Sequence, residues 1–367
     1  MLAIFTVFSF IWGAIWGSFL NVVIYRLPRG LNLAVPGSAC PSCKRPIPWY
    51  ENVPLLSWLL LRAKCRGCGT SIAPRYFVVE LLTALLSTAL FWKIAAGRFG
   101  DGNLQVLVPY LFYFAFLCSL ISVSVIDLEL TLIPDIITIP TAILGLIAAF
   151  AVPESGLMSK LHPNPSWLDS LIGALGGAGL FAGIAYGYKA ITGRIGLGGG
   201  DFTMIAMIGA FLGWQSLPIV MLAASVQGLL YAIGAAILEK IRGEKGGVLL
   251  RGVHKAEFWE NKDPRQLAST PDASEVEADP SQVDQSDTVQ DSAGEVRHDS
   301  VDTAVAEDAT EPDDLHESTP GQDSERQAEE ADRFGTMGIP FGPFLALGAL
   351  EYLFIGELIE KAIFGLQ

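Results

Sequence analysis

Residues 105–135 read QVLVPYLFYFAFLCSLISVSVIDLELTLIPD, and the first 22 of them contain no charged side chain. A run of about 20 apolar residues is long enough to cross the hydrocarbon core of a bilayer as a helix. The whole chain of 367 residues is 51% hydrophobic and only 17% charged, and its apolar residues are concentrated in blocks. We therefore predict an all-α polytopic membrane protein.

The apolar blocks lie at residues 2–23, 77–92, 105–126, 132–152, 168–188, 201–214, 216–238 and 340–362. The first block is interpreted as a retained span, because its start, MLAIFTVFSF, lacks the basic region of a cleaved signal peptide. The second block contains Glu80 and the sixth is short, so these two fit the pattern least well. Together the blocks predict about eight transmembrane helices.

Basic residues indicate the orientation. Eight Lys and Arg residues follow the first block, two follow the fifth, and five follow the seventh between positions 240 and 255. Because positive charges favour the cytoplasm, these three connections are predicted to lie inside, with both termini outside.

The segment 257–334 is unusually acidic. It contains 24 acidic and 5 basic residues, a net charge of −19, whereas the whole chain carries −14, so the rest of the chain carries +5. The segment cannot bury enough apolar surface to offset its ordering entropy, and we predict a disordered insertion in a cytoplasmic loop. It is interpreted as a solvated linker, with docking of a basic partner as the alternative.

Cys40, Cys43, Cys65 and Cys68 form two C-x-x-C pairs in the loop after the first block. Four thiolates at this spacing can surround one tetrahedral Zn²⁺ ion. Disulfides are the alternative, but the cytoplasmic side is reducing. Four cysteine ligands leave no open coordination position, so the sequence predicts a structural metal site that holds together a loop too small for its own core. Cys118, in the third block, is interpreted as an apolar core residue.

Carboxylates inside apolar blocks are costly and point to function. Asp127 ends the third block and Asp201 begins the sixth, so the predicted topology places both at the same cytoplasmic depth. Two such aspartates can share a proton, so that one acts as a general acid while the other activates water for attack on an amide. A transporter ion site or a proton relay is the alternative. Asp135, at the start of the fourth block, is a candidate positioning residue, although a carboxylate there can also cap a helix.

Glycines precede Asp201 in the stretch GRIGLGGGDFTM, residues 193–204. Without a Cβ, the glycines at 196 and 198–200 let the backbone adopt positive φ and let a substrate or a neighbouring helix approach closely. Phosphate binding is the alternative, but the carboxylate of Asp201 would compete with an anion. Gly198 and Gly200 are therefore candidate residues for positioning the substrate or the loop.

Several motifs together resemble the type IV prepilin peptidase family, also called prepilin leader peptidase/N-methyltransferase, among the G-x-G-D intramembrane aspartyl proteases. They are GSFLNVVIYRLPRG at 17–30, the paired C-x-x-C motifs, DLELTLIPD at 127–135, GLGGGD at 196–201 and IPFGPFLALGAL at 339–350. The resemblance implies a multi-pass enzyme of the bacterial inner membrane, with Asp127 and Asp201 as the catalytic pair. It also implies its substrates: precursors of type IV pilins or type II pseudopilins, cut at the cytoplasmic face. No nucleic acid is expected as a partner.

The resemblance further implies methylation of the new N-terminal amine from S-adenosylmethionine by the N-terminal part of the chain. Glu51, Arg75 and Glu80 are weak candidates for contacting this methyl donor, together with Asn21 and Arg26. Each has a structural alternative. The arginines can simply mark the membrane interface, and Glu80 can pair with Arg75.

Thr203 departs from the family pattern, which usually has a lysine two residues after the second aspartate. This difference makes a catalytically weakened assembly factor of a pilus or type II secretion system the alternative function. We predict four parts: a first helix and zinc-binding loop associated with methyl transfer (1–76), a membrane aspartyl peptidase core (77–256), the acidic insertion (257–334) and a last transmembrane helix (335–367).

Overall fold

The computed structural model describes residues 2–95, 106–151, 165–192, 198–242 and 340–364. Within these residues the secondary structure is helical, apart from two isolated β-bridges, Ala39 with Pro46 and Lys64 with Ser71. The all-α prediction is therefore confirmed for the described part of the chain. The predicted acidic insertion lies outside the described residues.

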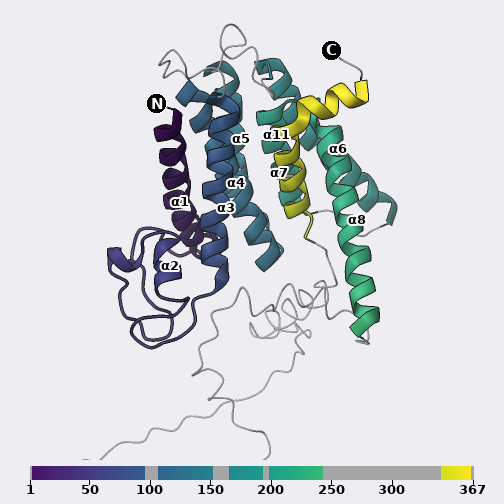
Figure 1. Cartoon of the computed structure of the whole chain (residues 1–367). Coiled ribbons are helices and arrows are strands. Elements are labelled where there is room, and N and C mark those ends of the chain that lie inside the picture. Colours follow the sequence, from purple (N-terminus) through teal and green to yellow (C-terminus); the bar gives the residue numbers. More distant parts are fainter. Residues whose placement is uncertain (1, 96–105, 152–164, 193–197, 243–339, 365–367) are drawn as a thin grey trace, which may run out of the picture. The chain divides into compact units, whose positions relative to one another are not determined.

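Figure 1 shows the helices, coloured in chain order. They are α1 (Leu2–Arg26), α2 (Leu56–Leu60), α3 (Pro74–Ala95), α4 (Leu107–Leu130), α5 (Asp135–Ala151), α6 (Trp167–Thr192), α7 (Gly199–Leu212), α8 (Ser216–Arg242) and α11 (Gly342–Phe364), with short 3₁₀ helices η1 (Leu27–Arg29) and η2 (Trp49–Glu51). Six of them, α1, α3, α4, α6, α8 and α11, are long and apolar enough to cross a membrane. The chain is a multi-pass membrane protein.

The predicted spans 132–152 and 201–214 form α5 and α7, which have 17 and 14 residues. At about 1.5 Å per residue these helices are roughly 26 and 21 Å long, less than the hydrocarbon core of about 30 Å. α7 begins only at Gly199 and ends at Leu212, because the next residue, Gly213, has a φ of 79° that breaks the helix. The predicted count of eight spans is therefore not confirmed.

α4 forms the centre of the packing. It contacts α1, α3, α5 and α11, and Phe116, Leu117, Leu120 and Ile126 on it are fully buried. A helix that is hydrophobic on all sides belongs in a core. Cys118 is buried in the same core, as predicted.

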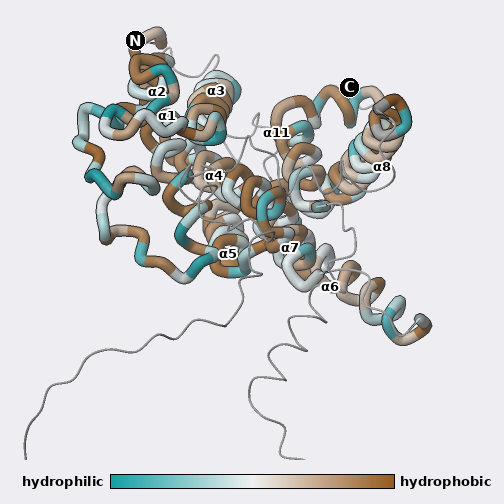
Figure 2. Tube along the Cα trace, turned by 90° about the horizontal axis from the view of Figure 1, so that it is seen from below, coloured by the Kyte–Doolittle hydropathy of each residue, from teal (hydrophilic) through white to brown (hydrophobic). Residues whose placement is uncertain are grey.

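Apolar side chains also cover the outside of the helices. On α8, Leu222, Leu229 and Leu230 are each more than 60% exposed. Figure 2 shows hydrophobic residues along the helices and more hydrophilic residues in the loop around α2. An extensive apolar exterior is what a lipid environment requires.

α1 and α3 pack at very close range through small residues. A Cβ on Gly13 would lie 2.7 Å from the Ala84 Cα, and one on Gly17 would lie 2.7 Å from the Glu80 Cα. Gly13 and Gly17 are four residues apart and so face the same side of α1. This is the small-residue spacing by which membrane helices approach closely, and it fixes α3 against α1.

Candidate functional site

Asp127 lies on the last turn of α4. The helix ends at Leu130, and the next residue, Thr131, has a left-handed φ of 50° and donates its N–H to the Asp127 carbonyl at 2.8 Å. Pro134 follows shortly afterwards and disfavours helical backbone in the residue before it. Asp127 is only 5% exposed, and its carboxylate accepts a hydrogen bond from the Gly342 N–H at 2.9 Å. Asp127 is thus held at a helix end, against the start of α11.

Asp201 is the third residue of α7, directly after the contact between Gly200 and Ile133. A Cβ on Gly200 would lie 2.5 Å from the Ile133 Cβ and 2.8 Å from its carbonyl oxygen. The close approach that the glycines were predicted to allow is therefore present at Gly200. Any other residue at this position would push α7 away from the loop that follows α4.

The prediction of positive φ before Asp201 is wrong for the described glycines. Gly198 has an extended φ of −73°, and Gly199 and Gly200 are already part of α7. A Cβ on Gly198 would only come within 3.7 Å of the Asp201 Oδ2, which is ordinary contact. These residues start a regular helix, so they need no left-handed backbone. Gly196 lies outside the described residues.

Ile133 joins the surroundings of the two aspartates. It contacts Gly200 on one side, and its Cδ1 would lie 3.3 Å from a Cβ on Gly342, the residue that holds Asp127. The end of α4 and the starts of α7 and α11 therefore meet around the loop 131–134, at one end of the helices (Figure 1). The structure brings the predicted residues Asp127 and Asp201 to the same end of the helical unit.

Asp135, the first residue of α5, is linked to α7. The Thr203 hydroxyl donates to Asp135 Oδ1 at 2.7 Å, and the Thr138 hydroxyl donates to Thr203 Oγ1 at 2.9 Å. A hydroxyl has one proton to donate and two lone pairs that accept, so Thr203 can serve both contacts at once. Thr203 therefore connects the start of α7 to the first turn of α5.

The four predicted cysteine ligands come together in the loop between α1 and α3. Their Sγ atoms all lie within 4.8 Å of one another, and the sulfurs of Cys40 and Cys68 are 3.8 Å apart. Zn–S bonds of about 2.3 Å in a tetrahedron place the sulfurs about 3.8 Å apart, whereas a disulfide requires about 2.05 Å. All four cysteines are free. The arrangement fits a tetrahedral thiophilic metal ion and does not fit disulfides.

Each C-x-x-C pair lies in the same kind of turn. In the first turn, the Cys40 N–H donates to the Arg45 carbonyl at 3.0 Å and the Lys44 N–H donates to the Cys40 carbonyl at 2.9 Å. The second turn repeats these bonds with Cys65, Thr70 and Gly69, at 2.8 and 2.9 Å. Lys44 and Gly69 occupy equivalent places, with φ of 57° and 74°. Two similar turns face each other and supply two sulfurs each.

The sulfurs differ in their surroundings. Burial raises the pKa of the Cys40 thiol to about 11. The hydrogen bond with Thr70 lowers the pKa of Cys68 to about 6. Cys68 is exposed, whereas Cys40 is buried, so the two sides of the cluster differ in their access to water.

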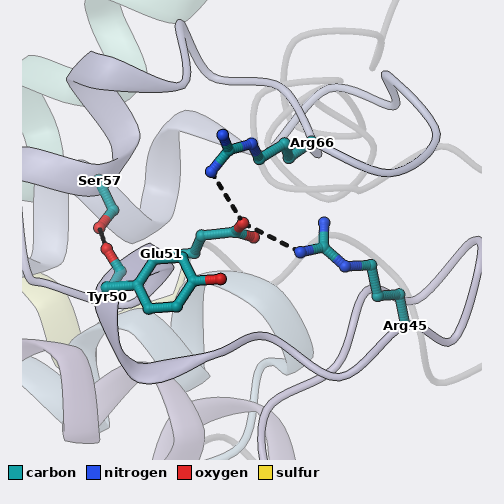
Figure 3. Close-up of polar contacts among 5 residues, drawn as sticks. All are labelled: Arg45, Tyr50, Glu51, Ser57 and Arg66. Carbon is teal, nitrogen blue, oxygen red and sulfur yellow. Dashed lines mark hydrogen bonds and ion pairs between the residues drawn. The ribbon is translucent and has the colours of Figure 1, made fainter.

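Glu51 links the two cysteine turns. Its Oε1 accepts hydrogen bonds from Arg45 at 3.0 Å and from Arg66 at 3.4 Å, and these two arginines come from the first and second turn (Figure 3). The Glu51 side chain is only 8% exposed, so it lies inside the loop. Beside it, the Ser57 hydroxyl donates to the Tyr50 carbonyl at 3.4 Å. These contacts give Glu51 a structural role within the loop.

Arg75 and Glu80, both on α3, have separate partners. Arg75 forms an ion pair with Glu129 on α4, and both side chains are largely buried. Glu80 accepts a hydrogen bond at 2.7 Å from the N–H of Leu55, which has a positive φ of 63°. The expected pairing of Glu80 with Arg75 is therefore wrong. The two residues are five apart on a helix, so their side chains point in directions about 140° apart.

The two remaining methyl-donor candidates hold the chain's own backbone. Arg26 donates to carbonyls of the loop that follows α1, with a shortest distance of 2.7 Å to Pro36. Asn21 donates from Nδ2 to the Gly17 carbonyl at 3.2 Å and to the Tyr76 carbonyl at 3.1 Å, which joins α1 to α3.

Three residues that shape the site were not singled out from the sequence. Glu129 and Ile133 lie inside the quoted motif DLELTLIPD, and Gly342 lies inside IPFGPFLALGAL. The Gly-Pro pair at the start of the last apolar block was a usable signal for Gly342, because proline is favoured in the first turn of a helix.

Two family descriptions match the chain. Residues 11–94 match the bacterial peptidase A24 N-terminal domain, and residues 114–233 match the type IV leader peptidase family. The first match contains the cysteine loop, and the second contains both aspartates. No solved structure gives a significant match to the chain.

Three similar proteins carry the description prepilin leader peptidase/N-methyltransferase. The protein of Aeromonas hydrophila is 39% identical over 253 residues, which cover 62% of this chain and 80% of that protein. The protein of Pseudomonas aeruginosa is 35% identical over 266 residues, covering 66% and 84%. The protein of Myxococcus xanthus is 40% identical over 231 residues, covering 63% of each.

Proposed function

This chain belongs to the type IV leader peptidase family, and we propose that Asp127 and Asp201 are its catalytic pair. Its substrates would be the precursors of type IV pilins or of type II pseudopilins, from which it removes the leader. One observation carries the proposal: the end of α4 and the start of α7, which bear the two aspartates, meet around Ile133.

Two carboxylates that share one proton supply both halves of amide hydrolysis. The ionised carboxylate takes a proton from water as the water oxygen bonds to the scissile carbonyl carbon, and the protonated one donates to the carbonyl oxygen. The carboxyl that took the proton from water then gives it to the amide nitrogen, the diol returns a proton to the other carboxylate, and the carbon–nitrogen bond breaks. The products are the leader's new carboxylate and the pilin's new N-terminal amine.

We propose that the chain lies in the bacterial inner membrane and that its two aspartates lie at the cytoplasmic face. The Arg75–Glu129 ion pair joins the cysteine-loop end of α3 to the Asp127 end of α4, so the basic loop and the aspartates lie at the same end. Basic loops favour the cytoplasmic side. The apolar helix of a pilin would lie among the spans while its basic leader stays in the cytoplasm, which brings the scissile bond to this end.

The cysteine loop would hold one structural Zn²⁺ through Cys40, Cys43, Cys65 and Cys68. When bound, the ion supplies the cross-link that a loop without its own core lacks. We assign the first helix and this cysteine loop, residues 1–76, to the part of the chain that transfers the methyl group. Residues 77–256 form the peptidase core, 257–334 an insertion and 335–367 the last helix.

S-adenosylmethionine would be the methyl donor for the new N-terminal amine. Among Glu51, Arg75 and Glu80, Arg75 is the first to test, because its buried Nε has no hydrogen-bond partner in the described structure. A guanidinium N–H is a suitable donor to the carboxylate of the methyl donor. Arg75→Lys should lower methylation of a pre-cleaved pilin more than it lowers cleavage, and equal losses would argue against this assignment.

The test uses the purified full-length protein in detergent with a pilin-type precursor. The wild type should cleave the precursor, and Asp127→Ala or Asp201→Ala should abolish cleavage. A transporter or a silent assembly factor would not cleave in any form. Only Thr203 suggested an assembly factor, and its hydroxyl is already used between α5 and α7, so we do not favour that alternative.

A further inference from the structure

We propose that Gly342, at the start of α11, is a positioning residue of the peptidase site, which holds one carboxylate oxygen of Asp127 through its backbone N–H. The proposal rests on the proposed function of Asp127. It adds to the site a segment outside the region 114–233 that matches the leader peptidase family. Asp127 and Gly342 are 215 positions apart in the chain.

The contact is a buried hydrogen bond of ordinary length. The Gly342 N–H donates to Asp127 Oδ2 at 2.9 Å, and both residues are buried. A carboxylate that accepts a backbone N–H at a helix start gains a charge-assisted hydrogen bond. Such a bond fixes the orientation of the carboxylate, which could otherwise rotate about its side-chain bonds.

In the first turn of α11, the Gly342 N–H is the one that donates to a group outside the helix start. Pro343, the second residue, has no N–H, and the N–H groups of Phe344 and Leu345 both donate to the Phe341 carbonyl at 3.1 Å. The first N–H groups of a helix have no partner within the helix and need one elsewhere. Gly342 meets this need with the carboxylate of Asp127.

A side chain at this position would crowd the Asp127 carboxylate. A Cβ on Gly342 would lie 2.7 Å from Asp127 Oδ2, 3.3 Å from Asp127 Cγ and 3.3 Å from Ile133 Cδ1. Real Cβ atoms do not approach other atoms as closely as 2.7 Å. An added methyl group would therefore displace the Asp127 carboxylate or move the start of α11 away from it.

α11 is held in place by α8, which keeps the N–H aimed at Asp127. The two helices pack along their length, and Gln227 on α8 donates to Glu351 on α11 at 2.9 Å. Gly348 lies so close to α8 that a Cβ there would be 2.8 Å from the Val220 carbonyl. The position of Asp127 thus depends on a helix pair that carries neither aspartate.

The test compares Gly342→Ala with Gly234→Ala in full-length protein, by measuring kcat and KM for cleavage of a pilin-type precursor. Gly234 lies on α8, and a Cβ added there would meet nothing within 4 Å, so alanine should leave both constants within about twofold. Gly342→Ala should lower kcat by about 10- to 100-fold, because small displacements of catalytic groups have effects of this size. Its KM should stay within about twofold, since substrate binding along the spans is untouched.

Two further measurements separate a local from a global defect. Methylation of a pre-cleaved pilin and bound metal should both be retained in Gly342→Ala. If that variant fails to fold, full-length chain carrying glycolic acid at 342 removes the N–H without adding an atom, and its kcat should also fall. Wild-type kcat in either variant would overturn the proposal. A wild type that cleaves no pilin precursor would instead overturn the proposed function itself.

Discussion

The cysteine cluster and the aspartate site differ in how the chain assembles them. All four sulfurs come from residues 40–68, and each pair is shaped by hydrogen bonds between residues at most five apart. The aspartate site draws on α4, the loop 131–134, α7 and α11, and its parts meet only through helix packing. A locally built site depends on its ligand for stability, whereas a composite site depends on the whole helical unit.

The largest effect is expected when the metal site of the cysteine cluster is removed. Cys65→Ser should reduce bound zinc from about one ion per chain to nearly none, because a structural site needs all four ligands. The loop between α1 and α3 should become sensitive to proteases, whereas the helices should not. Elemental analysis and limited proteolysis of protein purified without chelators measure both effects.

The control for this change is Cys118→Ala, which removes a cysteine from the core and not from the cluster. It should keep a full complement of metal. One metal ion per chain in Cys65→Ser would show that the cluster is not the metal site.

The composite site can be broken at its closest contact. Gly200→Ala would place a Cβ 2.5 Å from that of Ile133, so it should separate α7 from the loop and lower kcat for cleavage by about 10-fold or more. Gly199→Ala is the matched control, because a Cβ on Gly199 meets nothing within 4 Å. Comparable kcat values in the two variants would mean that the contact with Ile133 does not position Asp201.

The smallest expected effect sharpens the comparison at Thr203. Thr203→Val removes the hydroxyl that serves Asp135 and Thr138 while it keeps the shape of the side chain, and it should destabilise the protein by about 1–2 kcal/mol. Thr203→Ser, which keeps the hydroxyl, should lower the stability of the protein by less. Thermal unfolding in detergent measures the stability of both variants. An equal loss of stability in the two would mean that the hydrogen bonds of Thr203 do not stabilise the protein.

Sequence patterns predicted the local parts of this molecule better than the composite ones. The C-x-x-C spacing identified all four clustered sulfurs, since the ligands of each pair are near neighbours in the chain. The apolar blocks predicted the helices, and the sixth block, 201–214, matches the 14-residue helix α7 closely. The expectation that so short a helix spans the membrane is not confirmed, because block composition locates a helix without showing whether it crosses the bilayer.

The sequence predicted the two aspartates of the site and the close approach at Gly200, but not the residues that Gly200 and Asp127 contact. Asp127 and Asp201 stand out because a carboxylate in an apolar block needs a reason. Ile133 and Gly342 carry no such mark, because their importance lies in packing distances that arise between distant segments. The Arg75–Glu80 pairing failed for a different reason, since a spacing of five residues on one helix points the two side chains in directions about 140° apart.

The most direct measurement of the central claim is mass spectrometry of the N-terminus of a pilin precursor co-expressed with this protein. With the wild type, the account predicts a shortened pilin that carries one methyl group. With Asp127→Asn or Asp201→Asn, each of which keeps the size of the side chain, it predicts the intact precursor. A shortened pilin produced by either variant would contradict the claim that these two residues form the catalytic pair.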